Sequence, residues 1–148
     1  VIHFALEEIS RIGRTAAGVK GMALNVDDTV AYAFPHNSEG EVILISELGY
    51  MKRCLLIDFD RQARGGKGVK GFNFLKNGGN GTYIAGAVIV CVPFDMRIVQ
   101  KDGTETPLNT EEVAIESRLG KGTPYVVVVM NNYVAELQKV PIIEKNEV

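Results

Sequence analysis

The sequence repeats itself at an interval of about fifty residues, and this repeat constrains the fold more than any other feature. The run Gly-Val-Lys-Gly occurs at 18–21 and again at 68–71, and an arginine precedes each run at the same distance, Arg14 and Arg64. A third, degraded copy of this loop follows around Arg118, with Thr and Pro in place of the Val-Lys pair. Internal repeats of this length are typical of solenoids and propellers, in which each repeat forms one structural unit.

The segments between these loops also repeat, and they have the composition of β-strands. They are short, rich in Val, Ile, Tyr and Phe, and bounded by Gly, Asn or Asp, which is the usual pattern of strands separated by turns. We expect strands at 29–34, 42–46, 83–88, 96–100 and 133–138, and turns at 47–50, 77–81 and 101–104. Residues 109–117 could form one helical turn.

About four strands in each repeat match one blade of a β-propeller or β-pinwheel. The expected fold is therefore all-β, with roughly three blades of about four antiparallel strands in one partial domain spanning residues 1–148. We place the repeats at about 7–57, 58–110 and 111–148, with residues 1–6 as the end of another blade. Because one blade cannot bury both of its faces, we expect apolar blade faces to be exposed at the ends. The first residue is Val rather than Met, so we also expect a piece of a longer product.

The charge of the chain is unevenly distributed. Residues 51–100 hold 8 basic and 3 acidic side chains, a local charge of +5, whereas residues 1–50 and 101–148 carry −4 and −3. The formal net charge of −2 therefore conceals a local positive field, and it is the local field that acts on a polyanion.

The basic charge is concentrated on the glycine-rich loop at 61–71, which reads RQARGGKGVKG. Glycine lets the backbone approach a ligand closely, and successive N–H groups in such turns form anion-binding nests. Arginine and lysine add full charges, and arginine can bind a phosphate through two hydrogen bonds. Two interpretations stay open at this point: a phosphate-binding rim repeated at blade spacing, and an ordinary solvated connection.

Other kinds of site find no support in the sequence. No window matches the Walker pattern, no strand–glycine loop–long helix unit indicates a dinucleotide site, and no nucleophile lies in a recognisable set with a base. Cys54, Cys91, His3 and His36 lack the spacing of a zinc site, so we expect two buried free thiols and no metal or cofactor. The longest apolar run, 125–130, is far shorter than the roughly 20 residues that span a bilayer.

Four ordered segments carry a resemblance to a known family: GRTAAGVKGM at 13–22, LGYMKR at 48–53, RGGKGVKG at 64–71 and IAGAVIV at 84–90. The chain resembles, from about Ile2 to Val140, the C-terminal domain of the bacterial type II topoisomerase A subunits. It is most similar to that domain of DNA gyrase, and less so to that of topoisomerase IV.

This resemblance implies a six-bladed β-pinwheel whose blades exchange strands and whose basic outer rim binds and wraps double-stranded DNA. It implies a non-catalytic segment of an ATP-dependent topoisomerase in the bacterial cytoplasm, with a breakage-reunion domain upstream, and it implies that the gyrase B subunit is a partner. Binding would be independent of sequence and would support DNA supercoiling. The residues expected to contact DNA are Arg14, Lys20, Lys52, Arg53, Arg61, Arg64, Gly65, Gly66, Lys67, Gly68 and Lys70.

The sequence also departs from the family pattern. The family's box Q-R-R-G-G-K-G belongs to the first blade, whereas the similar run at 62–68 has Ala63 in place of an arginine and lies in a late blade. Leu48 and Met51 replace the usual Asn and Gly of the second motif. A rival function therefore stays open, namely a protein–protein assembly module that uses exposed blade faces and the basic loop, including pairing of two copies of the chain.

Overall fold

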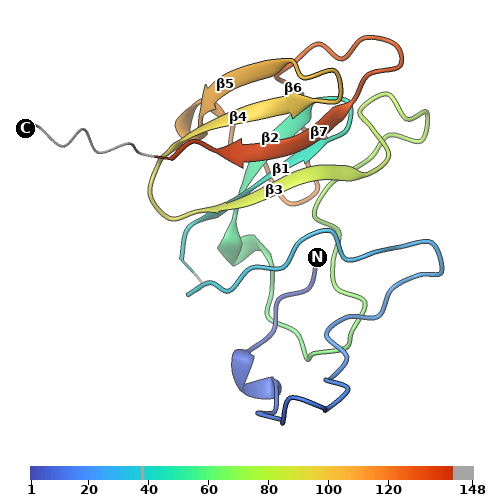
Figure 1. The fold of residues 1–148 in the computed structure, drawn as a ribbon, viewed down its shortest axis with the longest axis vertical. Helices are drawn as coiled ribbons and strands as arrows, with labels where there is room; N and C mark the ends of the chain where they lie inside the picture. Colours follow the sequence, from blue (N-terminus) through green and yellow to red (C-terminus); the bar gives the residue numbers. More distant parts are fainter. Residues whose placement is uncertain (38, 142–148) are drawn as a thin grey trace, which may run out of the picture.

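The computed structural model describes residues 1–37 and 39–141, and no α-helix occurs among them. Seven short strands form two antiparallel sheets, so the expected all-β fold is confirmed (Figure 1). The first sheet has the strand order β3-β1-β2-β6, and the second has the order β5-β4-β7. The strands are β1 (Glu41–Ser46), β2 (Tyr50–Leu55), β3 (Ile84–Val90), β4 (Asp95–Gln100), β5 (Glu105–Asn109), β6 (Thr123–Pro124) and β7 (Val134–Lys139).

Each sheet is built around a hairpin whose turn contains a glycine. Gly49 lies between β1 and β2 with φ of 81°, and Gly103 lies between β4 and β5 with φ of 89°. Such left-handed values are readily open to glycine because it has no Cβ. A third strand then pairs with the free side of each hairpin, β3 with β1 and β7 with β4. All of the strands expected after residue 40 are therefore present.

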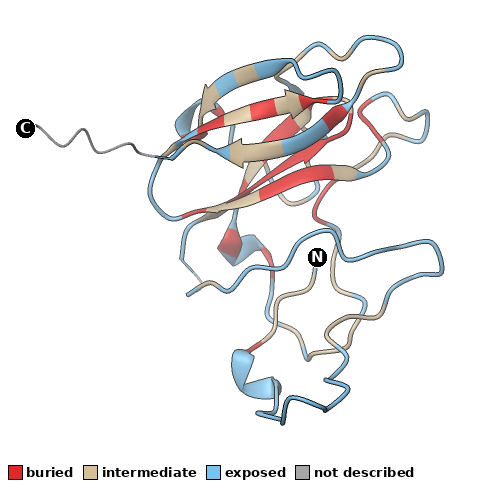
Figure 2. Ribbon diagram, viewed as in Figure 1, coloured by how far each residue is buried: buried red, intermediate tan, exposed pale blue. Residues whose placement is uncertain are grey.

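The main hydrophobic core lies between the two sheets. Ile43, Ile45 and Met51 of the first sheet pack with Met96 and Ile98 of the second, and all five are fully buried. Burying a side chain of this size stabilises the fold by roughly 1.5–3 kcal/mol. Figure 2 shows the buried residues concentrated in the two sheets, whereas residues before β1 are mostly exposed. The two sheets thus form the well-packed part of the molecule, to which the long first segment is attached.

Strands are exchanged between repeats, as the family resemblance implies. β6 belongs to the third copy of the repeat, yet it pairs with β2 and completes the first sheet. The same exchange occurs one repeat earlier, where the Val69 N–H donates to the Val1 oxygen at 2.7 Å and the Val1 amino group donates to the Val69 oxygen at 2.8 Å. Each of these two glycine-rich loops therefore ends in a segment that pairs with the backbone of a neighbouring unit, β2 in one case and Val1 in the other.

The internal repeat is visible in several further details. Short 3₁₀ turns occur at Leu6–Glu8, Leu56–Asp58 and Thr110–Glu112, and they are related by the same shifts as the sequence motifs. The last of these is the helical turn expected within 109–117. Isolated parallel bridges join His3 to Arg61 and Arg53 to Ile115, again at equivalent positions. The repeat boundaries proposed from the sequence stay a prediction, and residues 142–148 of the third repeat lie outside the described residues.

The strand expected at 29–34 is wrong, because these residues form no ladder (Figure 1). Their equivalents in β3 pair with β1, which lies well before β3 in the chain. No strand pairs with 29–34 among residues 1–37 and 39–141. Its anchor is instead the Tyr32 hydroxyl, which donates to the Ala85 oxygen at 2.7 Å. Strand propensity alone does not form a strand when the backbone has no partner.

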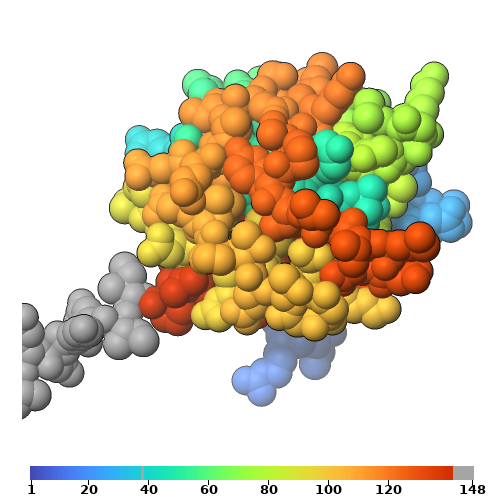
Figure 3. Space-filling view, turned by 90° about the horizontal axis from the view of Figure 1, so that it is seen from above, coloured from blue at the N-terminus to red at the C-terminus, as the bar shows by residue number. Residues whose placement is uncertain are grey.

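The expectation of apolar faces at both ends is wrong for the second sheet. Val99 and Arg97 of β4 alternate with the buried Ile98, so they point away from the core. Arg97 pairs across the sheet with Pro107 and with Gln138, and its guanidinium forms an ion pair of 2.7 Å with Glu105. Figure 3 shows the molecule from above, where residues of the last third of the chain, in orange, cover much of the surface beside teal and green residues of the middle of the chain. The outer face is therefore mostly polar and resembles that of a capping repeat.

Candidate nucleic-acid interface

The two glycine-rich loops, 11–21 and 61–71, lie side by side. The Gly65 N–H donates to the Gly21 oxygen and the Ala23 N–H donates to the Gly66 oxygen, both at 2.8 Å. These bonds join the end of the first loop to the middle of the second. The repeat therefore places the cations of both loops on neighbouring surface segments.

Two glycines of the second loop, Gly65 and Gly68, serve the fold. Gly65 and Gly68 have φ of 84° and 77°. A Cβ on Gly68 would lie 2.2 Å from the Val1 oxygen, so the close approach at Gly68 is to the N-terminal backbone at Val1. The Gly65 N–H is already donated to Gly21, and the Val69 N–H to Val1. Gly66 has room around it, and the nearest atom to its Cβ position is the Ala63 oxygen at 3.5 Å.

Lys52, which the sequence analysis expects among the DNA contacts, is an internal residue. Its side chain is fully buried, and its amino group donates to the oxygens of Ser117, Arg118 and Gly120 at 3.0, 2.8 and 3.0 Å. The amine also lies 5.2 Å from the centre of the Phe72 ring. Burial lowers the pKa of Lys52 below its ordinary value. The lysine holds the third glycine-rich loop against β2 and has no donor left for a phosphate.

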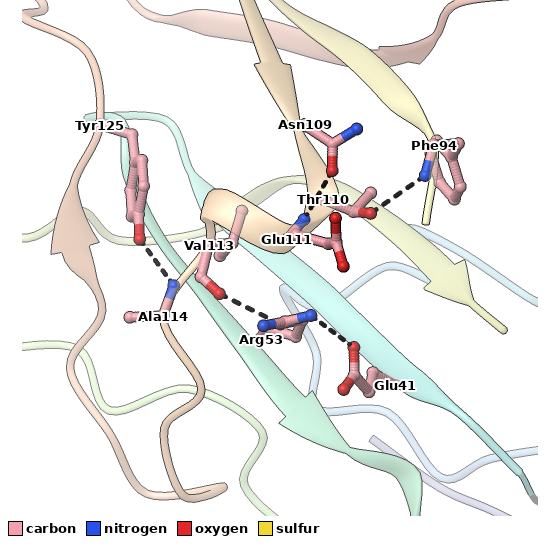
Figure 4. Close-up of polar contacts among 9 residues, drawn as sticks. All are labelled: Glu41, Arg53, Phe94, Asn109, Thr110, Glu111, Val113, Ala114 and Tyr125. Atoms are coloured by element: carbon pink, nitrogen blue, oxygen red, sulfur yellow. Dashed lines mark hydrogen bonds and ion pairs between the residues drawn. The ribbon is translucent and has the colours of Figure 1, made fainter. Parts of the chain in front are cut away.

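Arg53 is also an internal residue (Figure 4). Its Nε donates to the Val113 oxygen at 3.1 Å, and its Nη1 forms an ion pair of 3.0 Å with Glu41. Only 15% of its side chain is exposed. Nearby, the Tyr125 hydroxyl accepts from the Ala114 N–H at 2.7 Å, which fixes the same crossing of the chain. Arg53 therefore joins β1, β2 and the turn after β5, and its role as a DNA contact stays a prediction.

Arg64 is partly buried and bonded to the first repeat. Its Nε donates to the Glu8 oxygen at 3.1 Å, its backbone N–H donates to the Glu8 carboxylate at 2.7 Å, and its Nη1 donates to the Lys20 oxygen. Arg118 repeats the last of these contacts, because its Nη1 donates to the Lys70 oxygen at 2.8 Å. The guanidinium groups of both arginines are thus engaged with the backbone of the preceding loop.

Five of the predicted cations are exposed: Arg14, Lys20, Arg61, Lys67 and Lys70. Only Arg61 has a charged partner among the described residues, Glu7, at 3.9 Å and with 62% of the arginine side chain exposed. An exposed pair at that distance contributes little and leaves the arginine able to bind elsewhere. The site candidates thus divide into exposed cations on the two loops and internal cations that hold the loops in place.

Two further exposed cations belong to the same pattern and were missed. Arg11 is the equivalent of Arg61, and Lys121 is the equivalent of Lys67, and both are exposed. The repeat itself could have identified them, because aligning the loops matches Arg11 with Arg61 and Lys121 with Lys67. With them, each of the three loops carries at least one exposed cation.

Other kinds of site depend on three features of the chain: groups of metal-ligating side chains, the state of the two thiols and helices that could span a membrane. Within residues 1–37 and 39–141, no group of three or more His, Cys, Asp or Glu side chains could hold a metal ion. Cys54 is buried as expected, but Cys91 is exposed, so the expectation of two buried thiols is wrong for Cys91. No helix in the described part of the chain is both long and apolar enough to cross a membrane.

The sequence of this chain is similar to the C-terminal part of DNA gyrase A subunits. A family model described as the DNA gyrase C-terminal domain, beta-propeller, matches residues 1–37 and 40–79. The DNA gyrase A subunit of Staphylococcus epidermidis is 30% identical over 147 residues, and that of Kosmotoga olearia is 33% identical over 140 residues. The match covers 95% and 93% of this chain but only 16% and 17% of those proteins. The chain thus spans about a sixth of the length of these relatives.

Two solved structures share the fold. The C-terminal domain of DNA topoisomerase IV aligns with a TM-score of 0.82 at 23% identity, and the DNA gyrase A C-terminal domain aligns with a TM-score of 0.80 at 20% identity. Each alignment covers 93% of this chain, and 42% and 46% of the respective structures. At these identities the likeness supports the fold alone.

Proposed function

This chain belongs to the DNA gyrase C-terminal domain family, and from that premise we propose that it binds double-stranded DNA through the exposed cations of its glycine-rich loops. The contacts are made by Arg14, Lys20, Arg61, Lys67 and Lys70. They act on phosphates, which position the duplex without reading its sequence.

The observation that carries the proposal is the bonding of the two loops to each other. Because Gly65 and Ala23 join the loops through backbone hydrogen bonds, the exposed lysines stand on a connected surface rather than on independent tails. Phosphates recur along a duplex, and a row of fixed cations along a curved rim favours DNA that bends to meet them. Residues 1–50 and 101–148 are net negative, whereas residues 51–100 are net positive. A polyanion is therefore attracted to the basic loops rather than to the rest of the chain.

In the parent protein this binding supports a topoisomerase reaction that takes place elsewhere. The segment is non-catalytic, and it bends and wraps DNA for an ATP-dependent gyrase whose breakage-reunion domain lies upstream. Its partners are the duplex, that domain and the gyrase B subunit, and its location is the bacterial cytoplasm. The polar outer face of the second sheet argues against the rival function of assembly through that blade face.

Fluorescence anisotropy with duplexes of about 40 base pairs and two unrelated sequences tests the proposal over a range of salt concentrations. Neutralising five phosphates predicts a log–log salt slope of roughly −4.5 for both duplexes. The double variant Lys67→Ala, Lys70→Ala should have a slope shallower by about two. Lys101→Ala is the matched control, since this exposed lysine lies in the turn of the second sheet. An unchanged slope in the double variant would remove the loop from the binding site.

Bending requires a separate measurement. Donor and acceptor dyes at the two ends of the same duplex should move closer when the wild-type chain binds, and less so when the double variant binds. Binding with no change in the distance between the dyes would support a DNA-binding rim but contradict wrapping.

A further inference from the structure

We propose that Arg64 and Arg118 are positioning residues, which fix the DNA-binding lysine of the preceding loop through its main-chain oxygen. Arg64 holds Lys20, and Arg118 holds Lys70. This inference rests on the proposed function, because it explains how the lysines of successive loops come to have a fixed spacing.

The contact occurs twice, at equivalent positions of the repeat. Arg118 follows Arg64, and Lys70 follows Lys20, by the same shifts that relate the successive loops along the sequence. In both cases the Nη1 group of the arginine donates to the oxygen of the lysine one loop earlier. Two copies with the same donor atom and the same acceptor indicate a feature of the repeat rather than one chance contact.

The lysines need such a restraint because of their neighbours. Lys20 lies between Gly18 and Gly21, and Lys70 lies in the same Gly-Val-Lys-Gly run at 68–71. Glycines widen the range of backbone conformations, so an unrestrained loop would lose much conformational entropy when a phosphate orders it. A guanidinium bonded to the lysine oxygen restricts the backbone before DNA arrives and leaves the amino group in solvent.

Burial separates the two kinds of cation. Arg64 and Arg118 are partly buried, whereas Lys20 and Lys70 are exposed. Arg64 also donates to Glu8, so several of its hydrogen-bond donors are already engaged. Arg14, at the same position of the first copy, is exposed, and its side chain has no hydrogen-bond partner among the described residues. Arg14 therefore contacts DNA directly, whereas the two later arginines act through lysines.

Crossed double-mutant cycles on the full chain test this assignment, with affinity for duplex DNA as the readout. We expect Lys70→Ala to weaken binding about five- to tenfold near 0.1 M salt, the effect of one phosphate contact. Arg118→Ala should weaken binding to a similar extent, and the double variant should be little weaker than either single variant. The effects of Arg118→Ala and Lys20→Ala should be additive. For Arg64→Ala, the effect should be non-additive with Lys20→Ala and additive with Lys70→Ala.

The crossed design separates positioning from general stability, because loss of folding would affect Lys20 and Lys70 alike. If Arg118→Ala does not fold, the same cycle with Arg118→Lys applies, since a single amine replaces the planar guanidinium. Arg97→Ala is the matched control and should be additive with both lysines. Additive effects in every pair would overturn the inference and leave DNA binding intact. Failure of the wild-type chain to bind duplex DNA would overturn both proposals.

Discussion

Arg97 occupies in the second sheet the position that Ile43 occupies in the first, one repeat earlier. Ile43 is fully buried against the second sheet, whereas Arg97 faces outward and forms an ion pair with Glu105 at 2.7 Å. Glu105 in turn stands at the position equivalent to the buried Met51. The face that joins one sheet to the next is thus apolar in the first sheet and polar in the second. The replacement of two apolar residues by an ion pair ends the apolar stacking of blades at the second sheet.

Restoring the apolar residues should restore stacking. We expect the double variant Arg97→Ile, Glu105→Met to self-associate, with a mass about twice that of the wild type as concentration rises, because two identical apolar faces can pair. Sedimentation velocity measures the mass. The control Arg97→Lys, Glu105→Asp keeps the charges and should behave like the wild type. If the apolar variant keeps the wild-type mass at high concentration, the outer face does not limit stacking.

Gly68 and Gly18 provide a matched pair for testing the close approach at the second loop. Both have positive φ, 77° and 84°, but a Cβ on Gly18 meets no atom within 4 Å, whereas one on Gly68 lies 2.2 Å from the Val1 oxygen. Gly18→Ala should lower the free energy of unfolding by about 1–2 kcal/mol through backbone strain alone. Gly68→Ala should lower it by a further ~1–3 kcal/mol because of the clash.

Chemical denaturation of both variants measures this difference. Equal losses of stability would mean that the N-terminal segment moves aside without a penalty, and the pairing of Val1 with Val69 would then contribute little to the fold.

The sequence predicts the sheets well because the apolar pattern and the turn residues that define each strand lie within the strand's own segment and recur in each repeat. Strands β1, β3, β4 and β7 alternate or run apolar between turn residues, and their pattern recurs along the chain at the shifts of the repeat. The exception at 29–34 has the same composition, but a strand also needs a neighbouring backbone. The sequence of the segment does not specify whether such a neighbour is present.

The candidate site is predicted less completely, because the role of a cation depends on what packs against it. Lys52 lies on the same face of β2 as Cys54, and that alternation is a local signal that the lysine points inward. Its three acceptors, however, lie much later in the chain, between Ser117 and Gly120. Arg64 is likewise bound to the loop of the preceding repeat. Contacts at such separations are decided by the tertiary fold, which composition and spacing do not specify.

The two thiols should differ in reactivity. Burial raises the pKa of the Cys54 thiol above its ordinary value, while Cys91 is exposed. Only a thiolate reacts readily with a disulfide reagent. At about pH 8 we expect one thiol of the native chain to react rapidly with DTNB and the second to react only after unfolding, and Cys91→Ser should abolish the rapid phase. Two rapid phases in the native chain would contradict the burial of Cys54.

The raised pKa of Cys54 also has a consequence for stability. The folded state retains the thiol proton at a pH where the unfolded chain has lost it, so the free energy of unfolding should decrease as pH rises above the ordinary value of 9.0. Denaturation curves between about pH 8 and pH 10 measure this trend, about 1.4 kcal/mol per pH unit at most for one group. Cys54→Ala should have a weaker dependence. If the two chains show the same dependence, other groups cause it.

Lys52 and Lys70 should show opposite responses to the same substitution. Lys52→Met removes the donor for three main-chain oxygens, and unsatisfied buried acceptors are destabilising, so we expect a loss of about 2–4 kcal/mol in the free energy of unfolding. Lys70→Met changes an exposed side chain and should alter stability by less than about 0.5 kcal/mol. For DNA binding the order reverses: Lys70→Met should make the salt slope shallower by about one, and Lys52→Met should leave it unchanged.

Measuring both quantities on both variants assigns each lysine to one role. Urea denaturation gives stability, and anisotropy over a range of salt concentrations gives the slope, under conditions where each variant remains folded. A shallower slope for folded Lys52→Met would mean that its amino group leaves the carbonyl oxygens to reach DNA, which contradicts a purely internal role. A stable Lys52→Met with an unchanged slope would mean instead that the methionine packs on Phe72 well enough to offset the lost hydrogen bonds, because the amine already lies 5.2 Å from that ring.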